Sequence, residues 1–354
     1  MRRLLLLPAL FTTCCYAQPN YDFSPVTQQI QALVQRESLD GAALVVIQNG
    51  NVIYETYFGS YTVDTRIPIA SASKWLSAIA VERLVDRQQM SWSDTVGHYF
   101  PSAPADKQAI TLGQLFSHTA GMQTDDSNCL HNRLVSLDSC AQEILALPLA
   151  YSVGTTFAYG GNSIQVAGRM AEIASGKTWD QLFQDELTTQ LDMPNTDFAA
   201  GISFPPYVHV NNPLVAGGAR SSLHDYAHVV QMIAQHGSWN GAAYLDAAGV
   251  LEMQKDQTHG AAIAYTPDPL AHGYGYGEWR NAIDAAGVAV QVSSTGKFGT
   301  SPWVDNQLGL AAVFLVQSEY SRIVPDLRDL WGNVRDVVLS QDSLFAGGFE
   351  VISP

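Results

Sequence analysis

Residues 69–80, IASASKWLSAIA, place a serine and a lysine three positions apart at the start of a helical pattern. Apolar residues continue almost without interruption to Arg87, which predicts a helix that is buried on most sides. Residues three apart lie on one face of a helix, so the side chains of Ser71 and Lys74 can touch. Burial disfavours the charged ammonium, so Lys74 can act as the base that a serine nucleophile needs.

The Ser-x-x-Lys pattern by itself is weak, because it arises often by chance. A second match, Ser294-Thr295-Gly296-Lys297, follows a strand-like run and contains glycine, so no helical turn is expected there. A serine that caps a helix start is the plain alternative for Ser71. The catalytic interpretation therefore depends on the rest of the chain.

The regions on both sides of this helix predict an α+β protein. An Asn-Gly pair separates two β-rich runs near the N-terminus, which is typical of a hairpin. Strands near both ends, with helices between them, predict one antiparallel sheet flanked by helices, with a mostly helical subdomain inserted. The expected sheet subdomain covers about 18–90 and 214–354, and the helical subdomain about 91–213. Helices are expected at 24–37, 71–87, 112–117, 164–174, 223–236 and 326–340, and strands at 42–48, 52–58, 288–293 and 309–317.

Composition excludes several classes of protein. The 354 residues are 47% hydrophobic and only 14% charged, which is enough apolar material for a large core. The formal net charge of −15 argues against nucleic acid and anionic lipid as partners. After the first residues, no segment is long and apolar enough to span a membrane.

Residues 1–17 are typical of an export signal peptide. Arg2 and Arg3 precede a short apolar run, and Cys15-Tyr16-Ala17 fits a cleavage site. The sequence thus predicts a periplasmic or secreted protein. An ordinary buried helix is the alternative, and lipid attachment at Cys14 or Cys15 is disfavoured by the preceding residues.

Removal of the signal leaves Cys129 and Cys140 as the only cysteine pair. In an oxidising compartment, two cysteines eleven apart favour a disulfide that closes a surface loop. Free buried thiols, or half of a metal site, are the alternatives. The chain has no Cys-x-x-Cys, which disfavours the metal site.

Several ordered segments resemble the serine β-lactamase and penicillin-binding-protein superfamily, especially class C β-lactamases and their esterase and D-aminopeptidase-like relatives. Residues 69–80 resemble the nucleophile segment of that family. Further along, 110–122 (ITLGQLFSHTAGM), 153–178 and 214–226 (LVAGGARSSLHDY) resemble three later signatures in the same order. The resemblance covers nearly the whole mature chain and implies no metal and no organic cofactor.

The resemblance also implies roles for residues in the second family motif, Tyr-x-Asn. Tyr159 takes the tyrosine position, where a phenol near Lys74 can relay a proton. Gly161 stands where the family has asparagine, and Asn162 is one residue late. We therefore name both as candidate substrate-binding residues, and expect recognition of an amide side chain to be altered.

The third family motif, Lys-Thr-Gly or His-x-Gly, corresponds to Ser294-Thr295-Gly296. Its glycine lets a substrate lie close to the strand, and the backbone N–H groups of Lys297 and Ser71 would form the oxyanion hole. Ser294 supplies no charge, which disfavours the carboxylate of β-lactams and D-Ala-D-Ala peptides and favours an ester. Lys297 or Arg220 is an alternative source of a cation.

Three histidines need a separate explanation. His224 and His228 are four apart on a predicted helix, but no third metal ligand is evident, so no metal site is expected. His118 belongs to a family signature and is interpreted as a core histidine with satisfied hydrogen bonds. No Gly-x-Ser-x-Gly occurs, which argues against an α/β-hydrolase.

Together these observations predict an exported serine hydrolase that acts on a small acyl compound, most simply a carboxylic ester. Ser71 attacks the carbonyl while Lys74 and Tyr159 take its proton. A β-lactamase or D-amino-acid peptidase with the same mechanism is the first alternative. A non-catalytic binder of cell-wall peptides or β-lactams is the alternative of another class. The sequence does not fix the oligomeric state.

Overall fold

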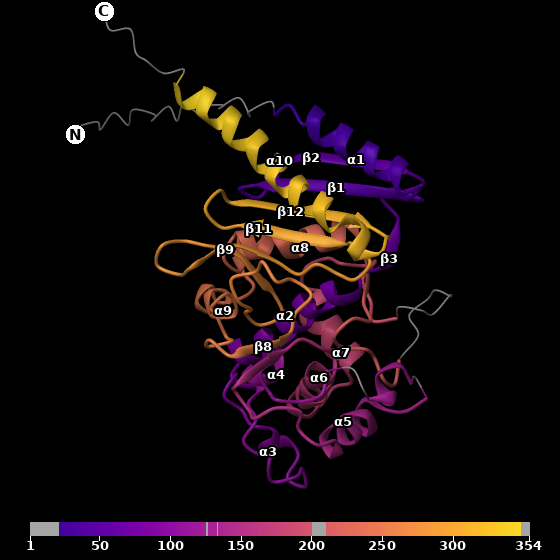
Figure 1. Ribbon diagram of the computed structural model, residues 1–354, viewed down its shortest axis with the longest axis vertical. Helices are drawn as coiled ribbons and strands as arrows, with labels where there is room; N and C mark the ends of the chain where they lie inside the picture. The colour runs from indigo at the N-terminus through magenta and orange to yellow at the C-terminus, as the bar shows by residue number, and fades with distance from the viewer. Residues whose placement is uncertain (1–20, 125–126, 133, 200–209, 348–354) are drawn as a thin grey trace, which may run out of the picture.

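The computed structural model describes residues 21–124, 127–132, 134–199 and 210–347, with no side chains considered beyond 341. The expected signal peptide, 1–17, lies outside these residues. Figure 1 shows a sheet with helices on both faces in the upper half and a group of helices in the lower half. Within the described ranges, no helix combines the length and hydrophobicity that crossing a membrane requires.

One six-stranded antiparallel sheet is built from both ends of the chain, as predicted. Its order is β2-β1-β12-β11-β10-β9, so the N-terminal hairpin lies beside the C-terminal strands. Ala42 of β1 pairs with Val316 of β12. The strands are β1 (Gly41–Gln48), β2 (Asn51–Gly59), β9 (Trp279–Ile283), β10 (Ala289–Ser293), β11 (Ser301–Asp305) and β12 (Leu310–Val316).

Helices cover both faces of this sheet, so β1 is buried along almost its whole length. Helices α1 (Ser24–Arg36) and α10 (Tyr320–Gly347) pack on the outer face around Trp303 and Phe314. Helix α8 (Leu223–Ala234) packs on the inner face, against β1, β11 and β12. Helix α2 (Ser73–Asp86) belongs to the large core on this inner side and is buried at almost every position, as the apolar pattern predicted.

The segment between α2 and β5 is mostly helical, which confirms the α+β class. The exact limits of the inserted subdomain, 91–213, stay a prediction. This segment contains α3 (Val96–Tyr99), α4 (Leu112–Phe116), η2 (Asn128–His131), α5 (Leu137–Ala146), β4 (Thr156–Ala158), α6 (Asn162–Ser175), α7 (Trp179–Phe183) and η3 (Gln184–Thr188).

Short elements return the chain to the sheet. Strand β5 pairs with β3, and β8 pairs in parallel with β4, which joins the last third of the chain to the helical part. The bounds are β3 (Arg66–Pro68), β5 (Arg220–Ser222), β6 (Ser238–Trp239), β7 (Ala242–Ala243), α9 (Ala247–Met253) and β8 (Ala262–Tyr265).

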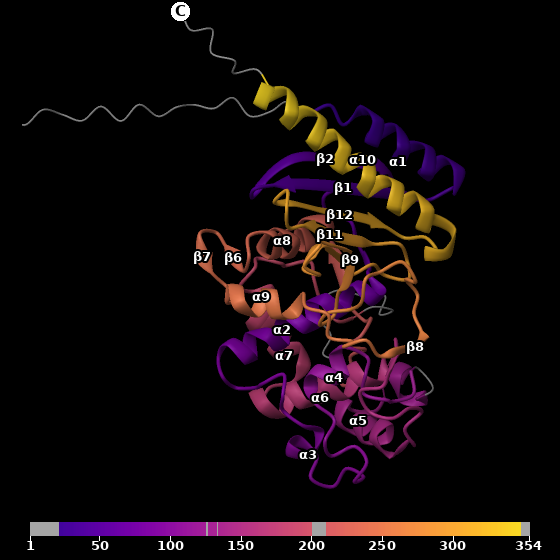
Figure 2. The same ribbon diagram turned by 60° about the vertical axis from the view of Figure 1, so that its left-hand side comes forward.

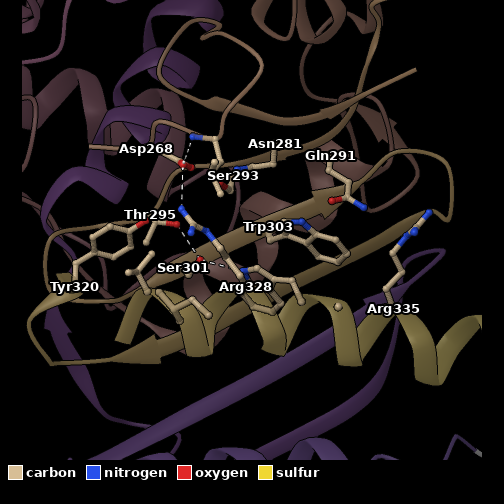
Figure 3. A pocket seen from close by; sticks show the side chains of 15 residues that line it. Asp268, Asn281, Gln291, Ser293, Thr295, Ser301, Trp303, Tyr320, Arg328 and Arg335 are labelled. Atoms are coloured by element: carbon tan, nitrogen blue, oxygen red, sulfur yellow. Dashed lines mark hydrogen bonds and ion pairs between the residues drawn. The ribbon is translucent and has the colours of Figure 1, made fainter. Parts of the chain in front are cut away.

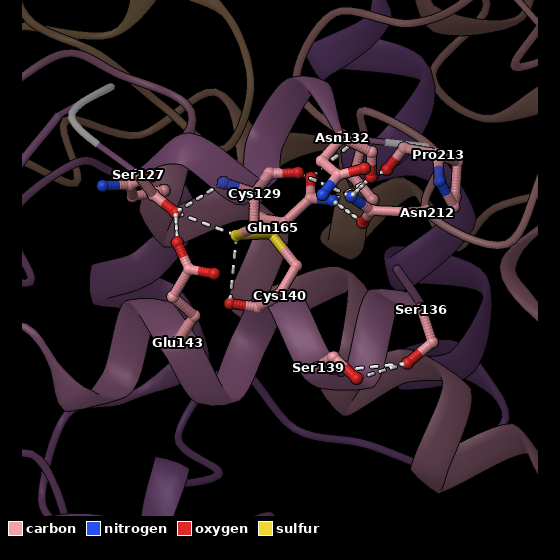
Figure 4. Close-up of a disulfide and its surroundings, with 12 residues drawn as sticks. Ser127, Cys129, Asn132, Ser136, Ser139, Cys140, Glu143, Gln165, Asn212 and Pro213 are labelled. Carbon is pink, nitrogen blue, oxygen red and sulfur yellow. Dashed lines mark hydrogen bonds between the residues drawn. A yellow bond between two sulfur atoms is a disulfide. The ribbon is translucent and has the colours of Figure 1, made fainter. Parts of the chain in front are cut away.

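Cys129 and Cys140 form the predicted disulfide, which joins η2 to α5 (Figure 4). Beside it, the Asn212 amide donates hydrogen bonds to the carbonyl oxygens of Cys129 (2.8 Å) and Asn132 (2.9 Å). Gln165 of α6 in turn donates to Asn212 Oδ1 (2.8 Å) and accepts from the Val215 N–H (3.1 Å). The bridged loop is therefore connected through buried amides to the segment that follows Asn212.

Loss of this bridge is expected to destabilise the protein by about 2–3 kcal/mol, because an eleven-residue loop would regain its freedom in the unfolded chain. The measurement is the free energy of unfolding in urea for Cys129→Ser/Cys140→Ser against wild type. Wild type treated with a reductant is the control and should match the double variant. Equal stability of the oxidised and bridge-free proteins would contradict this prediction.

Candidate active site

Ser71 lies in a single 3₁₀ turn, η1 (Ala70–Ala72), directly before α2. Ala70 has a φ of +47°, which is unfavourable for a residue with a Cβ, so the surrounding structure must hold the turn in place. The Ser73 hydroxyl does so, because it donates to Ala70 O (2.6 Å) and accepts from the Ala219 N–H (3.0 Å). The turn thus presents Ser71 from a fixed backbone.

Lys74 lies one helical turn later with its side chain buried. Its Nζ lies 3.1 Å from Ser71 Oγ and donates to the carbonyl oxygen of Ala216 at 2.9 Å. The same nitrogen lies 4.6 Å from the ring centroid of Tyr159. The structure therefore brings together Ser71, Lys74 and Tyr159, the three residues that the sequence named as catalytic.

Tyr159 follows β4 and is held in a cluster of aromatic rings. Its ring stacks on Trp279 with 5.2 Å between the centroids, and lies 4.6 Å from the ring of His118. The Tyr274 ring is nearly perpendicular to that of Tyr159, with 5.9 Å between the centroids. Only 8% of Tyr159 is exposed, so its phenol has a restricted position beside Lys74.

His118 is a core residue, as expected, but its hydrogen bonds are not satisfied. Neither ring nitrogen has a hydrogen-bond partner among the described residues. Burial, with a contribution from nearby Lys74, lowers the pKa of His118 well below its ordinary value. The ring is therefore neutral at pH 7 and packs against Tyr159 as a flat, nearly apolar surface.

This neutral histidine is expected to make the fold sensitive to acid. The pKa of His118 is lower in the folded state than in the unfolded chain. As the pH falls below about 6.5, His118 is therefore protonated in the unfolded chain but stays neutral in the folded protein, which favours unfolding. Neutral His118 thus causes no loss of folding stability above about pH 6.5. Below that pH, the free energy of unfolding falls by about 1.4 kcal/mol per pH unit because of this group.

His118→Phe should remove that part of the acid sensitivity while keeping the ring packing against Tyr159. The measurement is the free energy of unfolding of both proteins from pH 5 to pH 8. His259→Phe, at an exposed position, is the control. Parallel stability curves for wild type and His118→Phe would show that the prediction is wrong.

The third predicted motif lies beside Ser71. A Cβ on Gly296 would approach the Ile69 carbonyl oxygen to 2.1 Å, so only glycine lets this segment lie against the turn that carries Ser71. Within the described residues, neither the Ser71 N–H nor the Lys297 N–H donates to an acceptor. Both are thus available to hold an oxyanion.

Ser294, which replaces the family's cation, has a different environment from Thr295 and Gly296. It is buried, and its hydroxyl donates to the carbonyl oxygens of Gly277 (2.9 Å) and, more weakly, Ser71 (3.4 Å). It does not line the cavity in front of Ser71, so it supplies neither charge nor contact there.

A cavity of about 340 Å³ opens in front of Ser71 and Tyr159. Several of its lining residues were not predicted, because they come from loops and strand ends without a recognisable motif. Of these, Trp279 was the easiest to find from the sequence, since it lies two residues after the Gly-Tyr-Gly-Tyr-Gly run. The lining consists of Ser71, Tyr159, Tyr265, Pro267, Asp268, Trp279, Thr295, Gly296, Lys297, Glu319, Tyr320 and Ser321.

Other candidate residues lie elsewhere. Gly161 and Asn162 begin α6 outside the cavity lining, and the Asn162 amide donates to Gln123 O at 3.0 Å. Arg220 is paired with Asp197 at 2.6 Å, which leaves Lys297 as the candidate cation that lines the cavity. The described residues contain no group of three or more metal-ligating side chains; His224, for example, contacts Glu55.

Comparisons with known proteins agree with this geometry. The Beta-lactamase family model matches residues 26–335. A solved structure from Bacteroides dorei DSM 17855, provisionally assigned as a beta-lactamase, is 33% identical, covers 90% of this chain and 99% of its own, and has a TM-score of 0.78. A family VIII carboxylesterase is 19% identical, with coverage of 84% and 92% and a TM-score of 0.66, a likeness of fold alone.

Curated relatives match over a shorter region. Penicillin-binding protein 4 of Amycolatopsis lactamdurans is 26% identical over 191 residues, which are 49% of this chain and 48% of that protein. The chain thus spans less than half the length of the curated relatives that it matches, from 38% to 48%. The family model nevertheless covers most of this chain, and the chain therefore belongs to the beta-lactamase family.

Proposed function

We propose that this protein is an exported serine hydrolase that cleaves carboxylic esters through an acyl-enzyme on Ser71. The observation that carries the proposal is the 3.1 Å separation between Lys74 Nζ and Ser71 Oγ in a buried position beside Tyr159. A nucleophilic serine needs a base within hydrogen-bond reach, and a buried neutral amine is such a base. The beta-lactamase family membership and a carboxylesterase of the same fold support it.

The proposed reaction has two halves. Ser71 Oγ attacks the ester carbonyl carbon while its proton passes to Lys74 Nζ, and the Ser71 and Lys297 N–H groups hold the oxyanion. The proton then passes through Tyr159 to the alcohol oxygen as the bond to the alcohol breaks. Water attacks the acyl-enzyme and gives a proton back through the same groups, which releases the acid and restores the Ser71 hydroxyl.

An ester fits the cavity better than a substrate with a carboxylate beside the reacting bond. The position that would carry the recognition cation is Ser294, whose hydroxyl faces the Gly277 carbonyl oxygen rather than the cavity. Lys297 lines the cavity, but Glu319 and Asp268 do too, so the lining has no excess of positive charge. Export is supported by the disulfide, which an oxidising compartment maintains.

Labelling with a fluorophosphonate probe tests the nucleophile. Intact mass should show one probe molecule on wild type and none on Ser71→Ala, whereas Ser238→Ala, a surface change, should label like wild type. Equal labelling of wild type and Ser71→Ala, or no labelling of either, would contradict the proposal and favour a non-catalytic binder.

The second candidate function is a β-lactamase or D-amino-acid peptidase with the same three catalytic residues. Lys297 in the cavity lining favours it, because this cation could bind the carboxylate of such a substrate. Turnover of p-nitrophenyl acetate and of a chromogenic cephalosporin separates the two. The ester should be hydrolysed faster, and a faster cephalosporin would reverse the order of the candidates.

A further inference from the structure

A second cavity of about 360 Å³ lies next to the one in front of Ser71 (Figure 3). It lies between α10 and the outer face of the sheet, and buried Ser294 is not part of its lining. The two cavities share Asp268, Thr295 and Tyr320 among their lining residues. The two cavities therefore adjoin at these three residues.

Both arginines in the lining of this second cavity are paired with carboxylates, one in the lining and one buried behind it. The Arg328 guanidinium faces Asp268 at 3.5 Å, and Arg335 donates to Asp305 at 2.9 Å. Two cations thus meet two carboxylates, which removes the excess positive charge that an anionic ligand would need. The ligand expected here is uncharged.

The same lining offers both donors and acceptors. Asn281 Oδ1 is buried and has no hydrogen-bond partner among the described residues. A buried acceptor without a partner destabilises the protein, and a ligand that donates a hydrogen bond to it would remove that cost. Gln291 and the two arginines add amide and guanidinium groups around it (Figure 3). Hydroxyl groups both donate and accept, so a ligand rich in hydroxyls suits this mixture.

An aromatic wall completes the cavity. Trp331 of α10 stacks on Trp303 of β11, with 5.4 Å between the centroids and parallel rings. Trp303 is buried beneath it, so the half-buried Trp331 supplies a flat apolar surface that a ring with C–H faces can cover. A sugar ring presents such faces together with hydroxyls at its edge.

The length of the cavity sets the length of the ligand. Its lining follows the chain from Gln291 and Ser293 of β10 to Thr295, two residues after the end of that strand. The four steps from Gln291 to Thr295 cover roughly 13 Å in an extended chain, at about 3.3 Å per residue. A group that reaches Gln291 from the Ser71 cavity is therefore longer than one sugar ring.

We propose that the second cavity binds the alcohol part of the ester substrate, and that this part is an uncharged carbohydrate chain of two or more rings. This inference rests on the proposed function, since it assumes that the ester carbonyl is held at Ser71. Asn281, Gln291 and Trp331 are then the residues that determine the specificity for the distal rings.

A binding experiment without turnover tests the cavity itself. Calorimetry of Ser71→Ala with cellotriose should show saturable binding, and the added changes Asn281→Leu or Gln291→Leu should each weaken it at least tenfold. Adding Gln307→Leu, in an exposed turn outside the cavity, should leave it unaltered. Absent binding, tighter binding of trigalacturonate than of cellotriose, or unaltered affinity in both cavity variants would overturn the proposal.

A kinetic experiment separates this proposal from the proposed function. In the otherwise wild-type protein, Asn281→Leu and Gln291→Leu should each lower the ratio of kcat/KM for acetylated cellotriose to kcat/KM for p-nitrophenyl acetate at least tenfold. An unaltered ratio in both variants would overturn the carbohydrate proposal alone. If wild type hydrolyses neither ester, the proposed function fails, and the calorimetry still decides whether the cavity binds the chain.

Discussion

Replacing Lys74 by alanine is expected to lower kcat for p-nitrophenyl acetate by about 10³-fold or more, because the variant loses the base that takes the Ser71 proton. Lys74→Arg should lose nearly as much. Arginine keeps a positive charge at this position but cannot be deprotonated in a protein, so it cannot act as the base. The pair of variants therefore separates a need for a base from a need for a charge.

The measurement for Lys74 is steady-state hydrolysis together with the rate of fluorophosphonate labelling. Both should fall, since both depend on activation of Ser71. Lys255→Ala, at an exposed position, controls for loss of a lysine elsewhere and should behave like wild type. A Lys74→Arg variant that keeps more than a tenth of the wild-type kcat would show that Lys74 acts through its charge.

The second large effect is expected at Gly296. An alanine Cβ there would lie 2.1 Å from the Ile69 carbonyl oxygen, so the segment that follows β10 must move away from the turn that holds Ser71. The Lys297 N–H would move with it and leave the oxyanion site. Loss of one oxyanion donor typically costs 10²–10³-fold in kcat, and Gly296→Ala is expected to fall in this range.

Gly241→Ala is the matched control for Gly296→Ala. Gly241 has a φ of +77° and open space around its Cα, so alanine there strains the backbone at a turn far from the cavity. The control should lose about 1 kcal/mol of stability without loss of kcat. If Gly241→Ala lost as much kcat as Gly296→Ala, general destabilisation rather than the oxyanion site would explain the effect.

Sequence reasoning located the elements whose local pattern agrees with their final environment. The hairpin of β1 and β2, helix α2 and strand β12 were all expected close to their observed positions. Strand β11 was missed because its second residue is Pro302, and proline lacks the N–H that a central strand normally donates. Strand β9 was missed because Arg280 and Asn281 break its apolar pattern.

Helix α10 shows how a boundary can differ for a physical reason. The sequence predicted a helix near 326–340. The helix begins instead at Tyr320, upstream of that proline. Pro325 is the sixth residue of this helix, so its missing N–H costs one hydrogen bond to the preceding turn. Burial of Ile323 and Leu327 against the sheet offsets that loss and holds the helix on both sides of the proline.

The candidate site likewise contains residues whose positions follow from local sequence and residues whose positions depend on distant parts of the chain. Ser71 and Lys74 are one helical turn apart, so their proximity follows from local geometry that the sequence contains. Asp268 and Tyr320 reach the cavity through loop packing and the start of α10, which no local pattern encodes. The aromatic environment of Tyr159 likewise depends on residues more than a hundred positions away, such as Trp279.

The order of strands in the sheet has a consequence for how the protein is synthesised. Strand β1 is made early, yet one of its edges stays open until β12, Leu310–Val316, emerges to pair with it. Gly296, which lies against the turn of Ser71, also appears late in translation. Contacts of such long sequence separation form slowly. During synthesis, Ser71 and strand β1 are therefore made long before Gly296 and β12, the segments that lie against them in the folded protein.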